Sequence, residues 1–549
     1  MYSDKKSILQ LAALLLEHGI ERIVLCPGSR NTPLVQVFST HSRFRCFAVT
    51  DERSAGFFAL GLIQTDHKPV AVCCTSGSAV ANLYPAVAEA FYQQLPLIVI
   101  SADRPQQWIG QADGQTIPQP GIFGPLVRKA VHLPEVNTAE DEWYCNRLIN
   151  EALLAVSYKT AAPVHINVPL SEPLFQYTVE ALPQPRVIHR FSDLDSLLKG
   201  IGHDFHSPKK CLLLCGQMPP KTLSSRFIEA LSEKGVVCLS EHLGNCQAVG
   251  MIGYFDAWLE ALDKDKQQAL HPDLLITIGG HIVSKRLKQW LRGATIPQHW
   301  HLALDGALTD TYCSLSALIE TEPEGFLQQF LNSSILCCRE YASLWHPSES
   351  LTPCFSYSAM AAVGALCKVL PEGCVLHLAN SSAVRYAQLF ELPSSVEVFC
   401  NRGTNGIEGS LSTAVGFASA DSRPNFVLIG DLSFFYDLNA LWNTHLPSNL
   451  RILLLNNGGG EIFQTLPGVD TSKEVRRFVV GEHTTSAQAW VQDRGMDYRR
   501  VHNWEELTSA LSFLVQEKTC RSVLVEVFTN PQKDVQQLKE FYRNLKVRN

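Results

Sequence analysis

The sequence predicts an α/β protein made of three doubly wound parallel sheets. Short apolar runs rich in Val, Ile and Leu recur along the chain, with helical patterns between them. Most of these runs end in Gly, Ser, Asp or Asn, as strands do where a buried parallel sheet meets its loops. The nine clearest runs are RIVLCPGS, PVAVCCTSGS, PLIVISADRP, PVHINVPL, KCLLLCGQ, LLITIGGH, VLHLANS, NFVLIGD and RILLLNNGGG.

The bulk composition is that of a folded protein with several hydrophobic cores. The chain has 549 residues, which is too long for one core and favours roughly three or four domains. Its formal net charge is −7, and its 46 Lys and Arg residues are scattered rather than gathered in a stripe. This distribution argues against a nucleic-acid surface, although a local basic pocket for small anions remains compatible with it.

The first segment and the cysteines indicate a cytoplasmic protein. The opening run MYSDKKSILQLAALLLEHGI is similar to a signal-peptide core, but no small-residue cleavage site follows it, so we expect the first amphipathic helix there. The 17 cysteines include no CxxC pair and no zinc-ligand spacing. We expect most of them to be buried, reduced thiols. No stretch reaches the ~20 apolar residues of a membrane span.

Two extended, proline-bearing stretches divide the chain into three parts. They are residues 174–196 and residues 342–360. The predicted domains are 1–182, 183–350 and 351–549.

Polar residues end two successive apolar runs of the third part. Gly430 and Asp431 end one run, and Asn457, 26 positions after Asp431, ends the next before a glycine triplet. If these are neighbouring parallel strands joined by the helix DLNALWNTHL, both side-chain oxygens point into one crevice. A carboxylate, an amide oxygen and a backbone carbonyl suit Mg²⁺, and the glycines allow a diphosphate to approach the backbone. For either strand end alone, an ordinary turn is the commoner explanation.

This strand-end GD followed by a strand-end NN resembles the motif of thiamine diphosphate (ThDP) enzymes. Leu432 departs from the glycine that commonly follows the GD. In that superfamily a glutamate hydrogen-bonds the aminopyrimidine ring and is typically supplied by the neighbouring subunit, which implies a homodimer. Glu52, in TDERSAGFFALGL, is the candidate, and Ile407 is the candidate for the bulky residue that bends the cofactor. Otherwise Glu52 is an ordinary helix-start acid and Ile407 a core residue.

Basic side chains stand in polar settings at several predicted strand ends and loops. An average Arg is a solvated surface cation, but arginine forks that converge bind carboxylates in pairs. The strand-end context favours such a role for Arg30 and Arg104 in particular. The full set is Arg30 beside Ser29, Arg104, Lys285, Arg385 and Arg402.

These motifs together resemble one family along essentially the whole chain. The segments CPGSRNTPL, TSGSAVANLYPAVAEA, GQADGQTIPQPGIFG, GGHIVSKRL, NRGTNGIEGSLSTA and GDLSFFYDLNAL follow the order of the menaquinone-pathway 2-succinyl-5-enolpyruvyl-6-hydroxy-3-cyclohexene-1-carboxylate synthases. That family carries GDLS, which accounts for Leu432. Asn31 stands where relatives often carry Ser or Thr, and the 431–457 crossover is about one residue shorter than in some of them.

The resemblance implies a role for each matching position. The implied catalytic residues are Glu52, Gln115 and Arg30, and the implied ligands of Mg²⁺, with Mn²⁺ as an alternative ion, are Asp431, Asn457 and the carbonyl of Gly459. The implied cofactor-binding residues are Glu52, Ile407, Gly430, Asp431, Leu432, Ser433, Asn457, Gly459 and Ile462. The implied substrate-binding residues are Ser29, Arg30, Arg104, Gln115, Lys285, Ser381, Arg385 and Arg402.

The implied reaction joins two small acids. A member of this family decarboxylates 2-oxoglutarate with ThDP and adds the resulting succinyl carbanion to the conjugated double bond of isochorismate. No histidine accompanies the matched motifs, so the arginines are expected to position substrates and stabilise developing negative charge. The expected assembly is a homodimer or a dimer of dimers, with its active sites at the subunit interface.

Three other functions compete with this interpretation. Another ThDP-dependent 2-oxo acid decarboxylase or carboligase predicts fewer basic residues and often a histidine pair. A nucleotide-binding dehydrogenase requires GxGxxG after the first strand, which CPGSRNTPL does not supply. A scaffold that binds ThDP without turnover gives no reason to keep Glu52.

Overall fold

The computed structural model describes residues 1–200, 209–347, 351–442, 446–460, 463, 472–516 and 520–548. It divides into two compact units. The first comprises residues 1–190 with 316–318, and the second comprises residues 191–315 with 319–549. Each unit is described by itself below.

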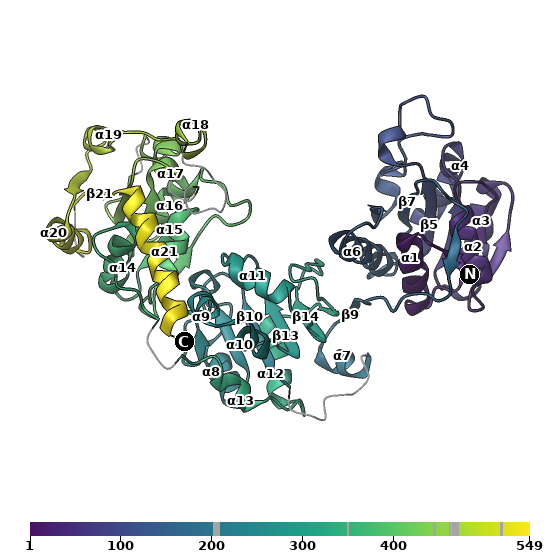
Figure 1. Cartoon of the computed structure of the whole chain (residues 1–549), viewed down its shortest axis with the longest axis horizontal. Helices are drawn as coiled ribbons and strands as arrows, with labels where there is room; N and C mark the ends of the chain where they lie inside the picture. The colour runs from purple at the N-terminus through teal and green to yellow at the C-terminus, as the bar shows by residue number, and fades with distance from the viewer. Residues whose placement is uncertain are drawn as a thin grey trace. The chain divides into compact units, whose positions relative to one another are not determined.

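The first unit contains a six-stranded sheet in which every strand pair is parallel, with the order β3-β2-β4-β5-β7-β6 (Figure 1). A separate antiparallel pair joins β1 and β8. The strands are β1 (Tyr2–Ser3), β2 (Arg22–Leu25), β3 (Arg45–Ala48), β4 (Val70–Cys74), β5 (Leu97–Asp103), β6 (Lys129–His132), β7 (Val164–Pro169) and β8 (Tyr177–Val179). The helices are α1 (Lys6–Glu17), α2 (Thr32–Thr40), α3 (Glu52–Asp66), α4 (Ser78–Asn82), α5 (Tyr84–Tyr92) and α6 (Ala139–Val156).

Helix α1 is buried more completely than the sequence predicts. The apolar run does form a helix, but all ten residues from Ser7 to Leu16 are buried, so the helix has no solvated face over this stretch. Figure 1 shows α1 beside α6, and the two helices pack against each other on the sheet. The polar residues Ser7 and Gln10 are buried beside the apolar ones, so neighbouring elements cover the polar side of this stretch as well.

The middle part of the chain forms a seven-stranded sheet of order β12-β11-β10-β13-β14-β15-β9, of which β10 to β14 belong to the second unit. Its strands are β9 (His189–Phe191), β10 (Cys211–Cys215), β11 (Val237–Ser240), β12 (Met251–Ile252), β13 (Leu274–Ile278), β14 (Gln298–Leu302) and β15 (Ala317–Ile319). From β10 to β15 this is the strand order of dinucleotide-binding folds. Its helices are α7 (Leu194–Gly200), α8 (Ser225–Lys234), α9 (Phe255–Ala261), α10 (Lys264–Ala269), α11 (Lys285–Arg292), α12 (Pro323–Asn332) and α13 (Arg339–Ser343).

The last part of the second unit holds another six-stranded sheet of parallel pairs, with the order β17-β16-β18-β19-β21-β20. The strands are β16 (Val375–Leu378), β17 (Glu397–Phe399), β18 (Asn425–Gly430), β19 (Leu450–Asn456), β20 (Asp497–Val501) and β21 (Val523–Phe528). The helices are α14 (Ala359–Val369), α15 (Ser382–Ala387), α16 (Ser410–Ala420), α17 (Asp431–Tyr436), α18 (Lys473–Val475), α19 (Gln488–Asp493), α20 (Trp504–Leu514) and α21 (Pro531–Arg548). Figure 1 shows α21 running back beside α9, with which it packs.

The predicted fold class is confirmed. Each of the nine apolar runs contains one strand of a large sheet, and each of those strands has parallel neighbours. All 17 cysteines are free thiols and most are buried, as expected. Among the described residues, no helix has the length and apolar character needed to cross a membrane.

Candidate active site

The first unit places its five predicted site residues along the carboxyl-terminal edge of its sheet. Ser29 and Arg30 follow β2, Glu52 begins α3 after β3, and Arg104 directly follows β5. Gln115 lies farther along the loop after β5 and is exposed, with a left-handed backbone φ of 56°. Strands β3, β2, β4 and β5 are successive neighbours, so these loops leave the sheet side by side.

Arg30 is a buried cation held close to a second cation. Its side chain is only 4% exposed, Nη1 donates to the Leu170 carbonyl at 3.0 Å, and Nη2 lies 3.0 Å from the Glu172 carboxylate. Burial lowers the pKa of Arg30, and the charge of Arg104 lowers it further. The structure therefore brings the two arginines together, and an added carboxylate would relieve their repulsion.

Arg104 is fixed by the loop that carries Gln115. Its Nε donates to the Gly114 carbonyl at 2.9 Å and lies 3.2 Å from the Asp113 carboxylate. The side chain keeps a partly exposed surface. The loop and the guanidinium therefore hold each other in place at the end of β5.

Glu52 lies at a strand-to-helix junction, as predicted. The preceding Asp51 caps α3 by accepting a hydrogen bond from the Ser54 amide at 3.0 Å. Glu52 is partly exposed, and its Oε2 accepts a hydrogen bond from Asn82 Nδ2 at 3.2 Å. Burial and the negative charge of Glu52 together raise the pKa of Cys26, at the end of β2, to about 12. The carboxylate thus lies at the carboxyl-terminal edge of the sheet, near the end of β2, and keeps an exposed surface.

Sequence reasoning missed a buried polar network beneath the Gln115 loop. Gln119 Oε1 accepts a hydrogen bond from the Gly77 amide, and Gln119 Nε2 donates to Asn167 Oδ1, both at 2.8 Å. Asn167 Nδ2 donates to Asp103 at 2.8 Å. Gly77 has a φ of 82°, and a Cβ there would lie 3.1 Å from the Gln115 backbone. The polar Asn167 within the apolar strand VHINVP was the available clue.

In the second unit, Asp431 and Asn457 follow neighbouring parallel strands, as predicted, and Asp431 also meets the glycine triplet. Asp431 begins α17 directly after β18, and β18 pairs with β19. The Asp431 carboxylate is 3% exposed. Its Oδ2 accepts hydrogen bonds from the amides of Gly458 at 2.8 Å and Gly459 at 3.0 Å. Asn457 directly follows β19, so its side chain starts from the same sheet edge.

The crossover between these two strands differs from the prediction. The sequence predicts one helix over DLNALWNTHL (437–446), but α17 (Asp431–Tyr436) comes before this segment and only a short 3₁₀ turn, Leu438–Leu441, lies within its described part; residues 443–445 lie outside the described residues. Asp437 separates the two pieces, because its carboxylate accepts hydrogen bonds from the Ser412 amide and hydroxyl. A side chain committed to another helix favours a break at that point.

The other predicted cofactor residues lie around Asp431 where the structure describes them. Ser433 Oγ donates to the Ile407 carbonyl, which ties the loop of Ile407 to α17. Leu432 contacts the backbone near Gly481, where an added Cβ would lie 3.8 Å from its methyl groups. Gly430 has open space on its Cβ side. Ile462 lies outside the described residues.

The residues present fit a divalent cation and a diphosphate. Asp431 is a buried carboxylate, and in the described part of the chain His483, with Nε2 3.4 Å from Oδ2, is its nearest ion-pairing base. That nitrogen is buried and makes no hydrogen bond. Within the same residues, no group of three or more His, Cys, Asp or Glu side chains forms a transition-metal cluster. One carboxylate, an amide and backbone groups form the hard, oxygen-rich set that Mg²⁺ prefers.

Basic side chains of the second unit gather at the ends of β16 and β17. Arg402 is 6% exposed and donates from Nη1 to Asn380 Oδ1 at 2.9 Å. Arg385 donates from Nη1 to the carbonyl of Ser381, the residue that precedes α15. Burial lowers the pKa of Arg385, and the charge of Arg402 lowers it further. As in the first unit, two predicted arginines lie close enough to repel each other.

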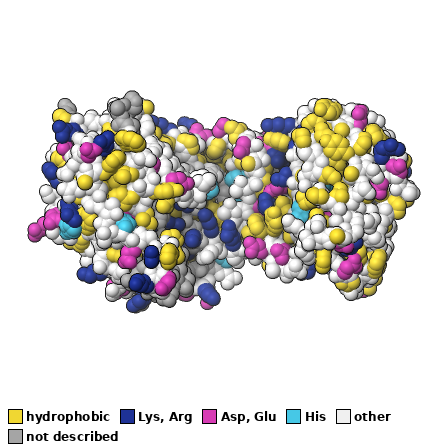
Figure 2. Space-filling model, turned by 90° about the horizontal axis from the view of Figure 1, so that it is seen from above, with side chains coloured by type: hydrophobic (Ala, Val, Ile, Leu, Met, Phe, Trp, Pro, Cys, Tyr) yellow, Lys and Arg dark blue, Asp and Glu magenta, His cyan; other side chains and the backbone are white. Residues whose placement is uncertain are grey.

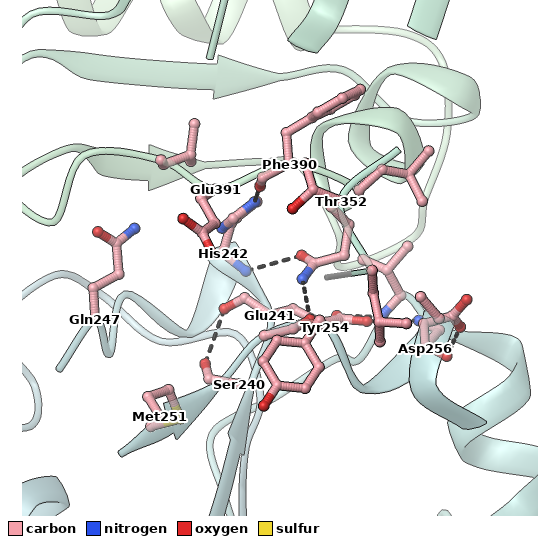
Figure 3. A pocket seen from close by; sticks show the side chains of 18 of the residues that line it. Ser240, Glu241, His242, Gln247, Met251, Tyr254, Asp256, Thr352, Phe390 and Glu391 are labelled. Carbon is pink, nitrogen blue, oxygen red and sulfur yellow. Dashed lines mark hydrogen bonds between the residues drawn. The ribbon is translucent and has the colours of Figure 1, made fainter. Parts of the chain in front are cut away.

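A cavity of about 1350 Å³ lies beside these basic residues within the second unit. Lys285, the exposed first residue of α11, and Arg385 both contribute to its wall. Figure 3 shows this pocket, with Glu241 and His242 at the end of β11 and Tyr254 and Asp256 near the start of α9. The dinucleotide fingerprint is absent here, because β10 leads into Gly216-Gln217-Met218. A Cβ on Gly216 would lie 2.2 Å from the Gly280 carbonyl oxygen, so Gly216 serves close backbone packing.

Comparisons with known families place two parts of the chain among ThDP enzymes. Residues 9–122 match the family profile "Thiamine pyrophosphate enzyme, N-terminal TPP binding domain". Residues 189–348 match the profile "Middle domain of thiamine pyrophosphate".

Curated relatives match the chain over nearly its whole length. A 2-succinyl-5-enolpyruvyl-6-hydroxy-3-cyclohexene-1-carboxylate synthase of Bacteroides thetaiotaomicron is 53% identical and covers 100% of both chains. Proteins with the same name from Flavobacterium johnsoniae and Porphyromonas gingivalis are 37% and 35% identical, and they cover 96% and 98% of this chain. The corresponding shares of those relatives are 96% and 97%. The chain therefore belongs to the ThDP-dependent 2-succinyl-5-enolpyruvyl-6-hydroxy-3-cyclohexene-1-carboxylate synthase family.

Proposed function

We propose that this enzyme decarboxylates 2-oxoglutarate and adds the succinyl carbanion to isochorismate, giving 2-succinyl-5-enolpyruvyl-6-hydroxy-3-cyclohexene-1-carboxylate and CO₂ in menaquinone biosynthesis. One observation carries the proposal. The buried Asp431 carboxylate meets the Gly458 and Gly459 amides at the ends of neighbouring parallel strands, in a chain 53% identical to a named synthase along its full length. The proposed domains are a pyrimidine-binding domain (1–182), a central domain (183–350) and a diphosphate-binding domain (351–549), each with one large sheet.

The proposed cofactor site uses the ends of β18 and β19. Asp431, Asn457 and the Gly459 carbonyl hold Mg²⁺ or Mn²⁺, and Gly430, Leu432, Ser433 and Ile462 surround the cofactor. Bound ThDP supplies an electron sink for decarboxylation of a 2-oxo acid. The Ser433 hydrogen bond to the Ile407 carbonyl supports this assignment, because it fixes the Ile407 loop against the helix that begins at Asp431.

Glu52 is the proposed proton-relay residue. The cap by Asp51 and the hydrogen bond from Asn82 orient the Glu52 carboxylate at the sheet edge. A carboxyl group held there hydrogen-bonds the aminopyrimidine nitrogen and so favours the tautomer that takes up a proton. Gln115, held against Gly77, and Arg30 complete the proposed catalytic group.

The proposed substrate contacts are the cations that repel one another in the structure. Arg30 with Arg104, and Arg385 with Arg402, are two such pairs. A carboxylate bound between two cations lowers their repulsion and gains charge-assisted hydrogen bonds. Both substrates are carboxylic acids, which suits these pairs, and Ser29, Lys285, Ser381 and Gln115 supply further polar contacts.

We further infer a cytoplasmic homodimer or dimer of dimers with Glu52 acting at the partner's cofactor. Large exposed apolar side chains support a subunit interface on the first unit, where Phe57 and Phe58 of α3 are each 44% exposed and Tyr92 of α5 is 79% exposed. Figure 2 shows hydrophobic side chains gathered on the face of the first unit seen there. Patches of this kind typically mark interaction sites.

The test is an ultraviolet assay of isochorismate consumption by the purified protein. We expect consumption only when Mg²⁺, ThDP and 2-oxoglutarate are all present, with loss of rate on omission of any one. Release of CO₂ from 2-oxoglutarate while isochorismate persists would instead identify a simple 2-oxo acid decarboxylase. Turnover of neither substrate would contradict the proposal and favour a non-catalytic ThDP-binding protein.

A further inference from the structure

Glu241 is a buried carboxylate that holds the start of α11. It follows β11 directly and is only 3% exposed. Its Oε2 accepts a hydrogen bond from the Val283 amide at 2.6 Å, and its Oε1 accepts one from the Ser284 amide at 2.7 Å. Each carboxylate oxygen therefore holds one of two consecutive backbone amides.

The segment held by Glu241 leads directly into a basic helix. Ser284 caps α11 by accepting a hydrogen bond from the Leu287 amide at 3.0 Å. Lys285 is the first residue of α11, and Lys288 lies one turn farther on. The position of the Glu241 carboxylate therefore determines where Lys285 begins its path into the cavity that it lines with Arg385.

Glu241 is also the counter-charge of several surrounding cations. Its negative charge raises the pKa of Lys288 and Arg385, against the lowering caused by burial and by the other cations. Among the described residues, Asp256 of α9 and the Tyr312 hydroxyl also face it. Asp256 forms an ion pair with Arg286, so its charge is already compensated. The net surroundings of Glu241 are therefore positive.

The place of Glu241 in the sheet corresponds to that of an acidic residue in dinucleotide-binding folds. It ends the second strand of a dinucleotide-type strand order, where an acidic side chain binds a ribose hydroxyl in nucleotide enzymes. Here both oxygens are already bonded to the backbone of a neighbouring loop. Figure 3 shows Glu241 among the labelled residues at the wall of the pocket.

We propose that Glu241 is a positioning residue for the carboxylate-binding cations, because it fixes the first turn of α11 and supplies the internal counter-charge for Lys288 and Arg385. This inference rests on the proposed function, since it assumes that Lys285 and Arg385 meet a substrate carboxylate. Glu241 itself acts through these cations and does not touch substrate.

The proposal predicts a pH effect on substrate affinity. Burial raises the pKa of Glu241 from 4.5 to about 7, although the two backbone hydrogen bonds lower it. Below pH 7 the group is neutral and the cations attract an anion fully, whereas above pH 7 its negative charge competes with that anion. The KM for 2-oxoglutarate should therefore rise as pH passes upward through 7.

Because the folded pKa is raised, the contribution of Glu241 to folding stability is complete below pH 4.5 and is lost as pH rises through 7.

Two substitutions separate the effect of the Glu241 charge from the effect of its side-chain length. Glu241→Gln removes the charge and mimics the protonated side chain, and Glu241→Asp keeps the charge but cannot reach both amides. We expect the KM of the wild-type enzyme for 2-oxoglutarate to rise about tenfold from pH 6 to 8.5, at nearly constant kcat. In Glu241→Gln the KM should no longer depend on pH, because the side chain does not titrate, and one of the Val283 and Ser284 amides should exchange faster, because the Gln NH₂ group cannot accept a hydrogen bond from it. In Glu241→Asp the pH dependence should remain while amide exchange at Ser284 and the first turn of α11 accelerates.

A matched control is Glu391→Gln, because Glu391 lines the same cavity but is exposed. It should leave the wild-type pH profile unchanged. The proposal is overturned if Glu241→Gln keeps the wild-type pH profile of KM, since that result leaves Glu241 a purely structural role. It is equally overturned if Glu241→Asp leaves amide exchange at Ser284 unchanged.

Failure of the proposed function is distinguishable from failure of this inference. A wild-type enzyme that does not consume isochorismate contradicts the function. Calorimetric titration of the wild-type holoenzyme with glutarate, an unreactive dicarboxylate, then tests the inference in two buffers of different ionisation enthalpy. Proton uptake on binding near pH 7 supports it, and binding without proton uptake contradicts it. The same titration applies if Glu241→Gln does not fold.

Discussion

The first and third large sheets share one plan but differ in their buried charges. Numbered along the chain within each sheet, both have the strand order 2-1-3-4-6-5. The fourth strand pairs with the sixth in the same register, with Ile98 opposite Val164 in one sheet and Arg451 opposite Val523 in the other. No repeat is visible in the sequence, so the shared plan rests on topology rather than on retained side chains.

At one equivalent point both sheets hold a carboxylate–amide pair, but the strands that carry the carboxylate and the amide are reversed. In the first sheet the last residue of strand four, Asp103, accepts a hydrogen bond from Asn167 at 2.8 Å. In the third sheet the corresponding pair is Asn456 and Glu526, at 2.7 Å, with the amide on strand four. Both pairs are almost completely buried. A hydrogen-bonded polar pair at this point is therefore common to both sheets, while the location of the charge is specific to each.

The strand ends above these pairs carry different chemistry. The first sheet presents Glu52 and two arginines, whereas the third presents Asp431 and a glycine-rich turn. The common frame determines where loops meet, and the side chains on the loops determine what they bind. Substitutions at matching places in the two sheets test this division.

The largest effect on catalysis is expected for Glu52, which follows the second strand of the first sheet along the chain. Glu52→Gln should lower kcat for isochorismate consumption by about 100-fold or more, with little change in KM, because the amide no longer supports proton transfer. Steady-state kinetics measure the effect. The exposed Glu140→Gln serves as the control, and an active Glu52→Gln enzyme would remove Glu52 from the proton relay.

In the third sheet, substitution of Asp431 should change the affinity for the cofactor. Asp431→Asn removes the buried charge and should weaken Mg²⁺-dependent ThDP binding by about 100-fold. Fluorescence titration with ThDP, with and without Mg²⁺, measures this without any turnover. Asp493→Asn, on an exposed carboxylate, should bind normally. Equal ThDP affinity in Asp431→Asn and wild type would show that this strand end does not hold the metal.

The exchanged polar pairs should differ in their contribution to stability. Glu526→Ala leaves the Asn456 side chain, the Ala487 amide and two hydroxyls without their acceptor, so we expect a loss of about 3 kcal/mol and a melting temperature lower by about 6–12 °C. Asp103→Ala should cost less, about 1–2 kcal/mol, since burial already raises the pKa of Asp103 and disfavours its charge.

Thermal unfolding of both variants, beside Glu526→Gln, measures this difference. The Gln side chain keeps one oxygen for Asn456 and Ala487, and the hydroxyls of Ser486 and Tyr498 can turn to accept from its NH₂ group. Its melting temperature should therefore lie close to that of the wild type. Equal losses in Glu526→Ala and Asp103→Ala would show that the two pairs are energetically equivalent despite their different charges.

The smallest effect contrasts two glycines near the ends of the third strands, Gly77 after β4 and Gly430 as the last residue of β18. Gly77→Ala should cost about 1–2 kcal/mol, because Gly77 has a φ of 82° and an added Cβ meets the Gln115 backbone at 3.1 Å. Gly430→Ala, with open space at its Cβ, should change stability by less than about 0.5 kcal/mol. Unfolding curves compare them, and a tolerated Gly77→Ala would indicate a loop free to move away.

Local patterns predicted strands and strand-end chemistry well. The run RILLLNNGGG is apolar until it leaves the sheet, so its strand and the turn that follows were both readable. The meeting of Asp431 with Gly458 and Gly459 followed from one rule about the edges of parallel sheets.

The sequence patterns did not predict contacts between residues that lie far apart in the chain. Glu241 holds amides more than 40 positions later, and Gln119 reaches Asn167 in a different strand. Neither contact leaves a periodic trace in the sequence. The helix predicted from Asp437 onward was wrong over Leu438–Leu441 for a similar reason, because Asp437 bonds to Ser412 and separates α17 from a short 3₁₀ turn. The roles of the predicted site residues stay predictions that the experiments above address.

The burial of ten consecutive residues of α1, Ser7 to Leu16, has a consequence for synthesis on the ribosome. This helix is made well before α6, which packs against it and begins only at Ala139. At about 5–20 residues per second, the apolar run waits on the order of 10 s for that partner. During that interval it is an exposed hydrophobic segment on a nascent chain. Chaperone occupancy on ribosome-bound chains should therefore peak before residue 139 emerges and decline once α6 has left the exit tunnel.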